Sequence, residues 1–216
     1  MPQRLTINNF LLTFQEFLIT WFNQILYYNK IYEDLIYDEI KTFDLIVYKN
    51  RNPDLIKYLE QFTLDLINNL IINKNQENGL VKITCVIYEE QDPTKYIRSY
   101  NLKFHEFLVN LNDTIISLQQ QENDTSAVIN IPEINWLEIN HRYKTILFLH
   151  IQELRKLKVD NNNELFFKIL VDLDKSIYPN SQWVRLEPNS NSNTRQIPVG
   201  NLELNILNFD LHNEYY

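Results

Sequence analysis

Apolar residues recur at helical spacing in three stretches of the chain, which predicts three α-helices. The first covers residues 9–30, the second begins at Asn52 and Pro53, and the third covers roughly 134–157. Asparagine caps helix starts well and proline fits the first turn, so the start of the second helix is sharply defined. The apolar stripe of the first helix consists of Phe10, Phe14, Phe17, Trp21, Ile25 and Tyr28. Its polar face lacks a basic cluster, so we expect a buried core helix and not a membrane-surface helix.

Alternating apolar and polar residues predict a β-hairpin in the middle of the chain. Residues 80–88 and 95–104 both alternate, and Asp92 followed by Pro93 marks the turn between them. One face of this hairpin should be buried. Residues 31–50 show no clear period, and we expect a loop there with one short strand.

A later strand is predicted at residues 164–173. Every second position is apolar, and Phe166 and Leu170 add apolar side chains to the other face, so we expect this strand in the centre of its sheet. Residues 201–211 alternate again with one change of phase, as a single strand with a bulge would. Three helices with an antiparallel sheet define an α+β fold, and 216 residues suit one domain.

Composition narrows the classes of function. The chain has 20 basic and 28 acidic residues, a net charge of −8 and no basic run. This composition disfavours direct nucleic-acid binding, for which only a local basic patch remains as an alternative. Its single cysteine, Cys85, forms no internal disulfide, so nothing indicates an oxidising compartment. No stretch approaches the ~20 apolar residues of a membrane helix, and the N-terminus lacks the pattern of a signal peptide. We expect a soluble, intracellular protein that does not bind membranes.

No catalytic or metal-binding motif is found. The four histidines lack the i, i+4 spacing of a helical metal pair, and His150 lies on an apolar stripe where a core histidine is expected. Cys85 alternates with apolar residues, which favours a structural buried thiol. Two glycines, Gly79 and Gly200, do not make a phosphate-binding loop. We therefore predict that the protein is not an enzyme and binds no cofactor or metal. An active site assembled from residues far apart in the sequence remains an alternative.

Several short segments, in the expected order along most of the chain, are similar to segments of a known protein family. They are Glu16 to Tyr32, Asn52 to Leu59, Tyr96 to Tyr100, Phe166 to Val171, Trp183-Val184, Arg195 to Pro198 and Ile206-Leu207. Together they resemble the HORMA-domain family, most closely the branch that provides the accessory subunit of translesion DNA polymerase zeta. Two positions depart from that pattern, with Glu33 in place of a proline and Asn52 in place of a histidine.

The resemblance implies a fold and a mechanism. The fold would be HORMA-like, with residues 1–216 as one domain, 1–173 as its core and 174–216 as a C-terminal safety belt. The belt would wrap over an extended partner peptide and trap it against the sheet, in the manner of an added strand. By the same resemblance, Tyr58 and Trp183 would contact a proline-containing peptide. As a structural alternative, Tyr58 ends a helix turn and Trp183 fills the core.

The resemblance also implies partners. These are the catalytic subunit of DNA polymerase zeta, a second translesion scaffold protein, and another HORMA protein through the third helix. The role would be that of a non-catalytic adaptor in translesion synthesis and DNA damage tolerance, located in the nucleus. Three alternatives remain at this point: a spindle-checkpoint HORMA protein, an enzyme with a scattered site, and a direct nucleic-acid binder with a basic face.

Overall fold

The computed structural model describes residues 5–67, 80–107, 135–159, 164–173, 184, 194–204 and 206–216. Three α-helices occur in these residues: α1 (Ile7–Tyr28), α2 (Pro53–Ile67) and α4 (Trp136–Leu154). The main sheet contains β3 (Leu80–Glu89), β4 (Tyr96–Phe107), β5 (Leu165–Leu173), β6 (Arg195–Leu204) and β7 (Leu207–Tyr215). Its order is β5-β3-β4-β7-β6, and every pair is antiparallel. The α+β class and the three predicted helices are therefore confirmed.

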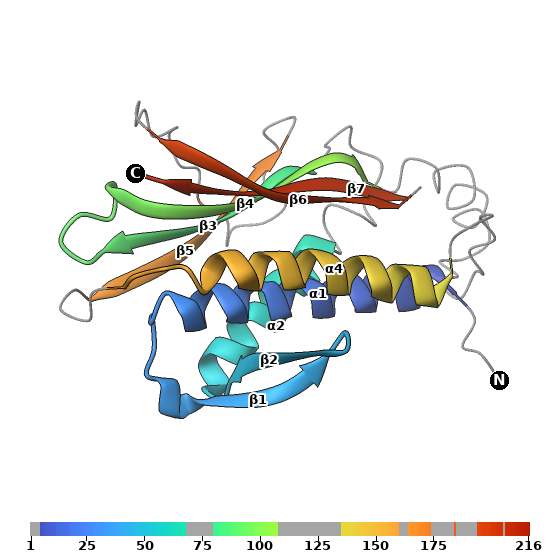
Figure 1. The fold of residues 1–216 in the computed structure, drawn as a ribbon, viewed down its shortest axis with the longest axis horizontal. Coiled ribbons are helices and arrows are strands. Elements are labelled where there is room, and N and C mark those ends of the chain that lie inside the picture. The colour runs from blue at the N-terminus through green and yellow to red at the C-terminus, as the bar shows by residue number, and fades with distance from the viewer. Residues whose placement is uncertain are drawn as a thin grey trace.

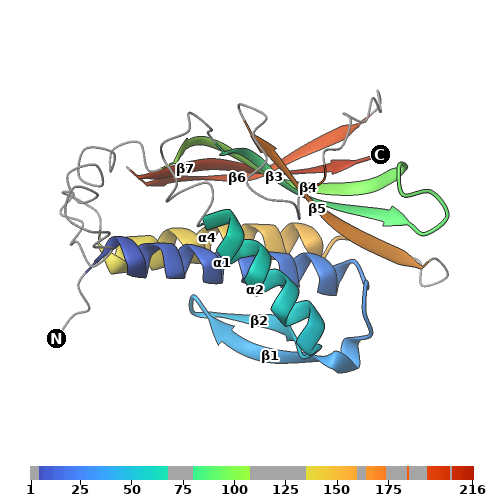
Figure 2. The ribbon, with the colours of Figure 1, turned by 180° about the vertical axis from the view of Figure 1, so that it is seen from behind.

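The elements stack in layers (Figure 1). Helices α1 and α4 lie side by side against one face of the main sheet, and the small sheet of β1 (Tyr37–Thr42) and β2 (Leu45–Asn50) lies on the other side of α1. Figure 2 shows α2 crossing α1 from the main sheet toward β1. None of the helices in the described ranges combines the length and apolar character needed to span a bilayer.

Helix α1 forms the centre of the core. The ring of Phe17 stacks on Tyr143 of α4 at a centroid distance of 4.7 Å and meets Phe209 of β7 at 5.7 Å. All three side chains are fully buried. The wide apolar stripe read from the sequence is thus explained, because α1 contacts a helix, a sheet and a hairpin at once.

Side-chain caps define the helix starts. The Thr6 hydroxyl accepts from the backbone N–H of Asn9 at 3.2 Å, and the Asn135 side chain accepts from that of Glu138 at 2.9 Å. At the start of α2, Asn52 accepts from the N–H of Asp54 at 2.9 Å. These bonds satisfy amides that have no partner inside the helix.

The segment 31–50 forms a hairpin and not a loop with one short strand. It contains a 3-10 turn, η1 (Asp34–Ile36), followed by β1 and β2. Phe43 and Asp44 at its tip both have positive φ, 49° and 56°, which is the two-residue geometry preferred in hairpins. This turn was not predicted because glycine or asparagine usually occupies such positions.

The C-terminal segment reverses direction where a single bulged strand was predicted. Leu204 of β6 pairs with Leu207 of β7, so the change of phase near residue 205 marks a tight turn between two strands. The resulting β6–β7 hairpin adds to the edge of β4. Strand β6 passes close to α4: a Cβ at Gly200 would lie 2.9 Å from the Cδ1 of Ile146, so a larger residue there would require that side chain to move.

Candidate functional site

The main sheet has two outer strands, β5 and β6. Strand β6 contains Pro198, which has no N–H, and its register shifts between Pro198 and Gly200. Strand β5 contains neither proline nor glycine, and within the described ranges no strand pairs with its outer side. It therefore presents a regular row of backbone donors and acceptors that another extended chain could use.

The position of β5 corrects the expectation of a central strand. Its apolar character on both faces is real, but each of those side chains is only partly covered, and Phe166 is 38% exposed. On the inner face the partly covered side chains that pack against the core are Leu165, Phe167, Ile169, Val171 and Leu173. Apolar residues on both faces are typical of an interior strand, which has a neighbour on each side. Strand β5 has this composition but lies at an edge, where one neighbour is missing among the described strands.

Tyr58 lies beside this edge strand. It projects from α2 with 45% of its surface exposed, and its ring meets Phe167 of β5 edge-on at a centroid distance of 6.1 Å. On its own helix it stacks with Phe62 at 6.4 Å. Partial burial raises the pKa of its hydroxyl, so Tyr58 offers a neutral, half-covered aromatic surface next to β5. Trp183 lies outside the described residues.

Strands β5 and β6 follow each other along the chain but occupy opposite edges of the sheet. Residues 174–194 therefore connect one edge to the other. With strands ~4.8 Å apart, four spacings make this separation roughly 19 Å. Strand β5 ends at Leu173, and Trp183 belongs by sequence to this connection. The division into a core of residues 1–173 and a belt of residues 174–216 stays a prediction.

A polar network fastens the β6–β7 hairpin to β4. The Glu214 carboxylate of β7 accepts from the Ser99 hydroxyl of β4 at 2.9 Å, from the Gln196 amide of β6 at 2.8 Å and from the Tyr216 hydroxyl at 3.0 Å. His212, 3.4 Å away, is the main cause that lowers the pKa of Glu214 to about 2, with these three donors adding to it against partial burial. Sequence reasoning missed this group because its members are far apart in the chain.

A second polar contact between the hairpin and the core involves a buried histidine. His150 of α4 is fully buried, 5.6 Å from the ring of Tyr100 and 6.0 Å from that of Trp21. Its ring faces the side chain of buried Asn213 on β7, and this polar contact opposes part of the effect of burial on the pKa of His150. Burial lowers the pKa of His150 to about 3, so the imidazole is neutral at pH 7. The predicted core histidine is confirmed.

The residues considered for catalysis do not converge. Cys85 is fully buried on β3, and burial raises the pKa of its thiol well above the usual range, which leaves no thiolate at neutral pH. His105 is exposed and pairs with Asp210 at 2.7 Å, on the opposite face of the sheet from His150. The described part of the chain holds no group of three or more potential metal ligands.

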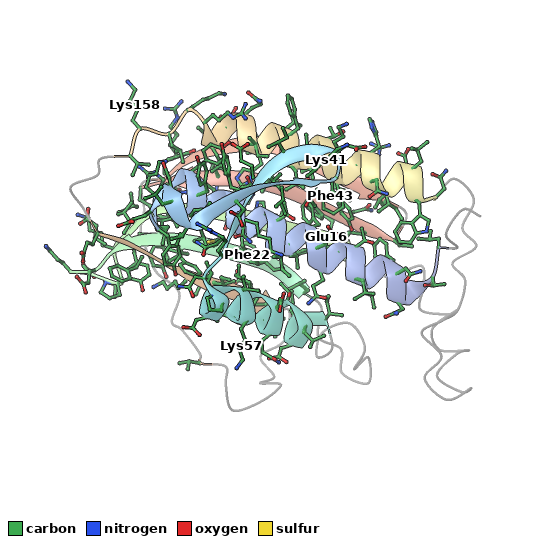
Figure 3. The ribbon with its side chains drawn as sticks, turned by 90° about the horizontal axis from the view of Figure 1, so that it is seen from below. Glu16, Phe22, Lys41, Phe43, Lys57 and Lys158 are labelled. Atoms are coloured by element: carbon green, nitrogen blue, oxygen red, sulfur yellow. The ribbon has the colours of Figure 1, made fainter. Side chains whose placement is uncertain are left out.

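A groove of about 520 Å³ lies between α1, α2 and the small sheet. Apolar side chains including Leu12, Ile56 and Leu64 line it, together with Glu16 and Lys57. Figure 3 shows Glu16 on α1 and Lys57 on α2 from this side. Tyr58 does not line the groove, so the groove and the β5 edge are separate features.

No family model and no curated protein matches the sequence, but solved structures do match. A chain of the crystal structure of the mitotic checkpoint complex has a TM-score of 0.70 at 14% identity, covering 94% of this chain and 95% of that one. Caenorhabditis elegans HTP-2 bound to the HIM-3 closure motif gives 0.67 at 12% identity, covering 98% and 92%. Caenorhabditis elegans HTP-1 bound to the same motif gives 0.60 at 11% identity, covering 93% and 87%.

These likenesses extend over nearly the whole length of each chain, although sequence identity is low. The chain therefore has the α+β fold of HORMA-domain proteins.

Proposed function

We propose that the chain is a non-catalytic adaptor that captures an extended peptide of a partner protein at the open edge of β5. The observation that carries this proposal is the regular, unblocked edge of β5, which is apolar on both faces and only partly covered. A peptide that pairs with β5 would become the sixth strand of the sheet. HTP-1 and HTP-2, which share the fold, are bound to closure motifs in their structures.

The two faces of β5 suggest how side chains of the peptide are recognised. Backbone hydrogen bonds to β5 supply affinity without sequence preference, and alternate side chains supply specificity. On the inner face, Phe167 and Tyr58 offer an aromatic surface suited to a proline or another apolar residue. On the outer face, Phe166 stacks beside Tyr88 at 6.1 Å and is exposed.

Residues 174–194 are proposed to close over the captured peptide as part of a safety belt formed by residues 174–216. This segment starts where β5 ends and must reach β6 at the other edge. Trp183, which belongs to this segment by sequence, would supply a second aromatic contact to the peptide. The β6–β7 hairpin, fastened to β4 through Glu214, would anchor the far end of the belt.

We propose the catalytic subunit of DNA polymerase zeta as the partner and translesion DNA synthesis in the nucleus as the role. The support is the similarity of the segment from Asn52 to Leu59, which contains Tyr58, and of Trp183-Val184 to that branch of the family. A second translesion scaffold protein would bind the belt surface.

Association with another HORMA protein would use α4. That helix exposes Leu137 and Phe148, which are 81% and 48% accessible. Their spacing of eleven residues places them on one side of the helix.

A spindle-checkpoint role is the second candidate. One observation favours it: the chain matched with a TM-score of 0.70 belongs to the mitotic checkpoint complex. The two roles share the mechanism of peptide capture and differ in the captured sequence.

Isothermal calorimetry with synthetic peptides tests the proposal and separates the two roles. We expect the proline-containing peptide of the polymerase zeta catalytic subunit to bind, and Trp183→Ala to weaken this binding with an unchanged circular dichroism spectrum. Binding of a spindle-checkpoint motif in its place would keep the adaptor role and reject the polymerase partner. Because a belt that is already closed would block binding, each peptide is also co-expressed with the chain. Failure of both peptides in both formats would reject peptide capture from these two partners.

A further inference from the structure

Basic side chains converge at one end of the molecule although the protein as a whole is acidic. A pocket of about 400 Å³ is lined by Arg98 of β4, Arg195 of β6, and Lys156 and Lys158 just after α4. Glu153 is the one carboxylate in its lining, and it pairs with Lys156. Four cations and one anion thus share a small volume of a chain whose net charge is −8. The pocket involves strands β4, β6 and β7, and not the open edge of β5.

Strand register explains why two of these cations meet. Arg98 and Arg195 are both cross-strand neighbours of Tyr215, one on each side of β7. Directly paired residues point to the same face of a sheet, so Arg98, Tyr215 and Arg195 lie side by side on one face. Two strand spacings separate their backbones by ~10 Å, a gap that two arginine side chains can bridge around a small anion.

Two of the four basic side chains already have polar partners among the described residues, and two do not. Arg98 donates to Asn29 at 3.0 Å, and Lys156 pairs with Glu153. Arg195 and Lys158 are exposed, and neither forms an ion pair or a side-chain hydrogen bond with the described residues. Figure 3 shows Lys158 at the outer end of the α4 segment, away from Lys41 and Lys57. Arg98 is therefore held in place, whereas Arg195 and Lys158 are available to a ligand.

We propose that this pocket binds a phosphorylated serine or threonine side chain in a partner protein. Arginine forks bind phosphate oxygens in pairs, and clusters of arginine and lysine are a recurring means of recognising phosphopeptides. The apolar wall formed by Leu157, Ile197 and Tyr215 gives the carbon chain next to the phosphate a surface to pack on.

The observations favour a single phosphate over a polyanion. The pocket is at the small end of the range for ligand sites, and its lining offers no further cation to continue a track along a nucleic acid. Nucleic-acid binding requires several phosphate contacts, and the excess of acidic residues opposes the approach of a long polyanion. Phosphorylation of the partner would thus add a second, regulated contact to the protein, independent of peptide capture at β5.

Fluorescence anisotropy of the full chain with four labelled probes tests this site. The probes are a leucine-rich peptide with one phosphoserine, the same peptide with serine or glutamate at that position, and a single-stranded DNA oligonucleotide. We expect the phosphopeptide to bind, inorganic phosphate to displace it, and the serine and glutamate peptides to bind at least about tenfold more weakly. Equal binding of the glutamate peptide, or tighter binding of the DNA, would overturn the proposal.

Two charge reversals locate the site. Arg195→Glu and Lys158→Glu should each weaken phosphopeptide binding about tenfold or more, because each replaces an attraction with a repulsion. Lys57→Glu makes the same change in charge on α2, away from the pocket, and should alter binding less than twofold. Circular dichroism serves as the control and should show that all three variants are folded. Equal losses in all three would indicate nonspecific attraction, and no loss in the first two would reject the pocket.

Discussion

The ring of Tyr58 on α2 meets the ring of Phe167 on β5 edge-on, with 6.1 Å between their centroids and 71° between their planes. One ring comes from a helix and the other from the edge strand, so α2 contacts the open edge of the sheet through this pair. Nearly half of the Tyr58 surface is still free. The pair therefore forms one wall of the space that a peptide beside β5 would enter.

Replacing Tyr58 should impair capture of the peptide more than folding. We expect Tyr58→Ala to weaken peptide binding by about 2 kcal/mol, roughly thirtyfold, as for an aromatic anchor at an interface. Tyr58→Phe should retain most of the affinity because it keeps the ring. Leu64→Ala is the matched control, since Leu64 is an equally exposed apolar residue on the same helix that lines the other groove. If calorimetry shows the same loss for Leu64→Ala, Tyr58 is not an anchor.

Glu214 should stabilise the C-terminal hairpin at neutral pH and lose this effect in acid. Its pKa is about 2 in the folded protein against an ordinary value of 4.5, so the folded state favours the charged carboxylate. The stabilisation is complete above about pH 4.5 and disappears as the pH falls toward 2. We expect Glu214→Gln to lower the free energy of unfolding by about 1–2 kcal/mol at pH 7, a figure reduced for partial exposure.

Urea denaturation at pH 7 and pH 3 measures this effect. Glu203→Gln serves as the control, because Glu203 is an exposed carboxylate in the same hairpin. The difference between wild type and Glu214→Gln should shrink at the lower pH. A constant difference at both pH values would show that the carboxylate charge contributes nothing.

His150 should make the protein less stable in mild acid. Its pKa is about 3 when folded and 6.5 when free, so between these values the unfolded chain binds a proton that the folded chain does not. Stability therefore falls as the pH drops below about 6.5. By pH 5 we expect a loss on the order of 1–2 kcal/mol, which His150→Leu should remove.

Urea denaturation between pH 7 and pH 5 separates this effect from that of Glu214, which acts at lower pH. His141 is exposed on the same helix, and His141→Leu should keep the pH dependence of the wild type. A His150→Leu variant with the wild-type slope would contradict the assignment.

The sequence predicted the helices and the β3–β4 hairpin well because burial there repeats with a local period. It predicted β5 as a strand but placed it in the centre of the sheet. Apolar residues on both faces do not distinguish a central strand from an edge strand that pairs with a partner peptide. The pairing of the C-terminal hairpin with β4 could not be predicted. It depends on contacts such as Ser99 with Glu214, which join residues more than a hundred positions apart.

The same limit applies to the candidate sites. Tyr58 was named through resemblance, and its position beside Phe167 required the structure. The basic pocket was not visible in a sequence without a basic run, because Arg98, Lys158 and Arg195 meet only after β4, α4 and β6 are assembled. A charge count over the whole chain hides a local cluster of this kind.

A partner peptide that pairs with β5 should change hydrogen exchange along that strand. The exchange is measured on the chain alone and in complex with the peptide that binds in calorimetry. Alternate amides of β5, those that do not pair with β3, should become protected in the complex, and the outer amides of β6 should exchange as before. Protection along β6 with no change in β5 would contradict this pairing.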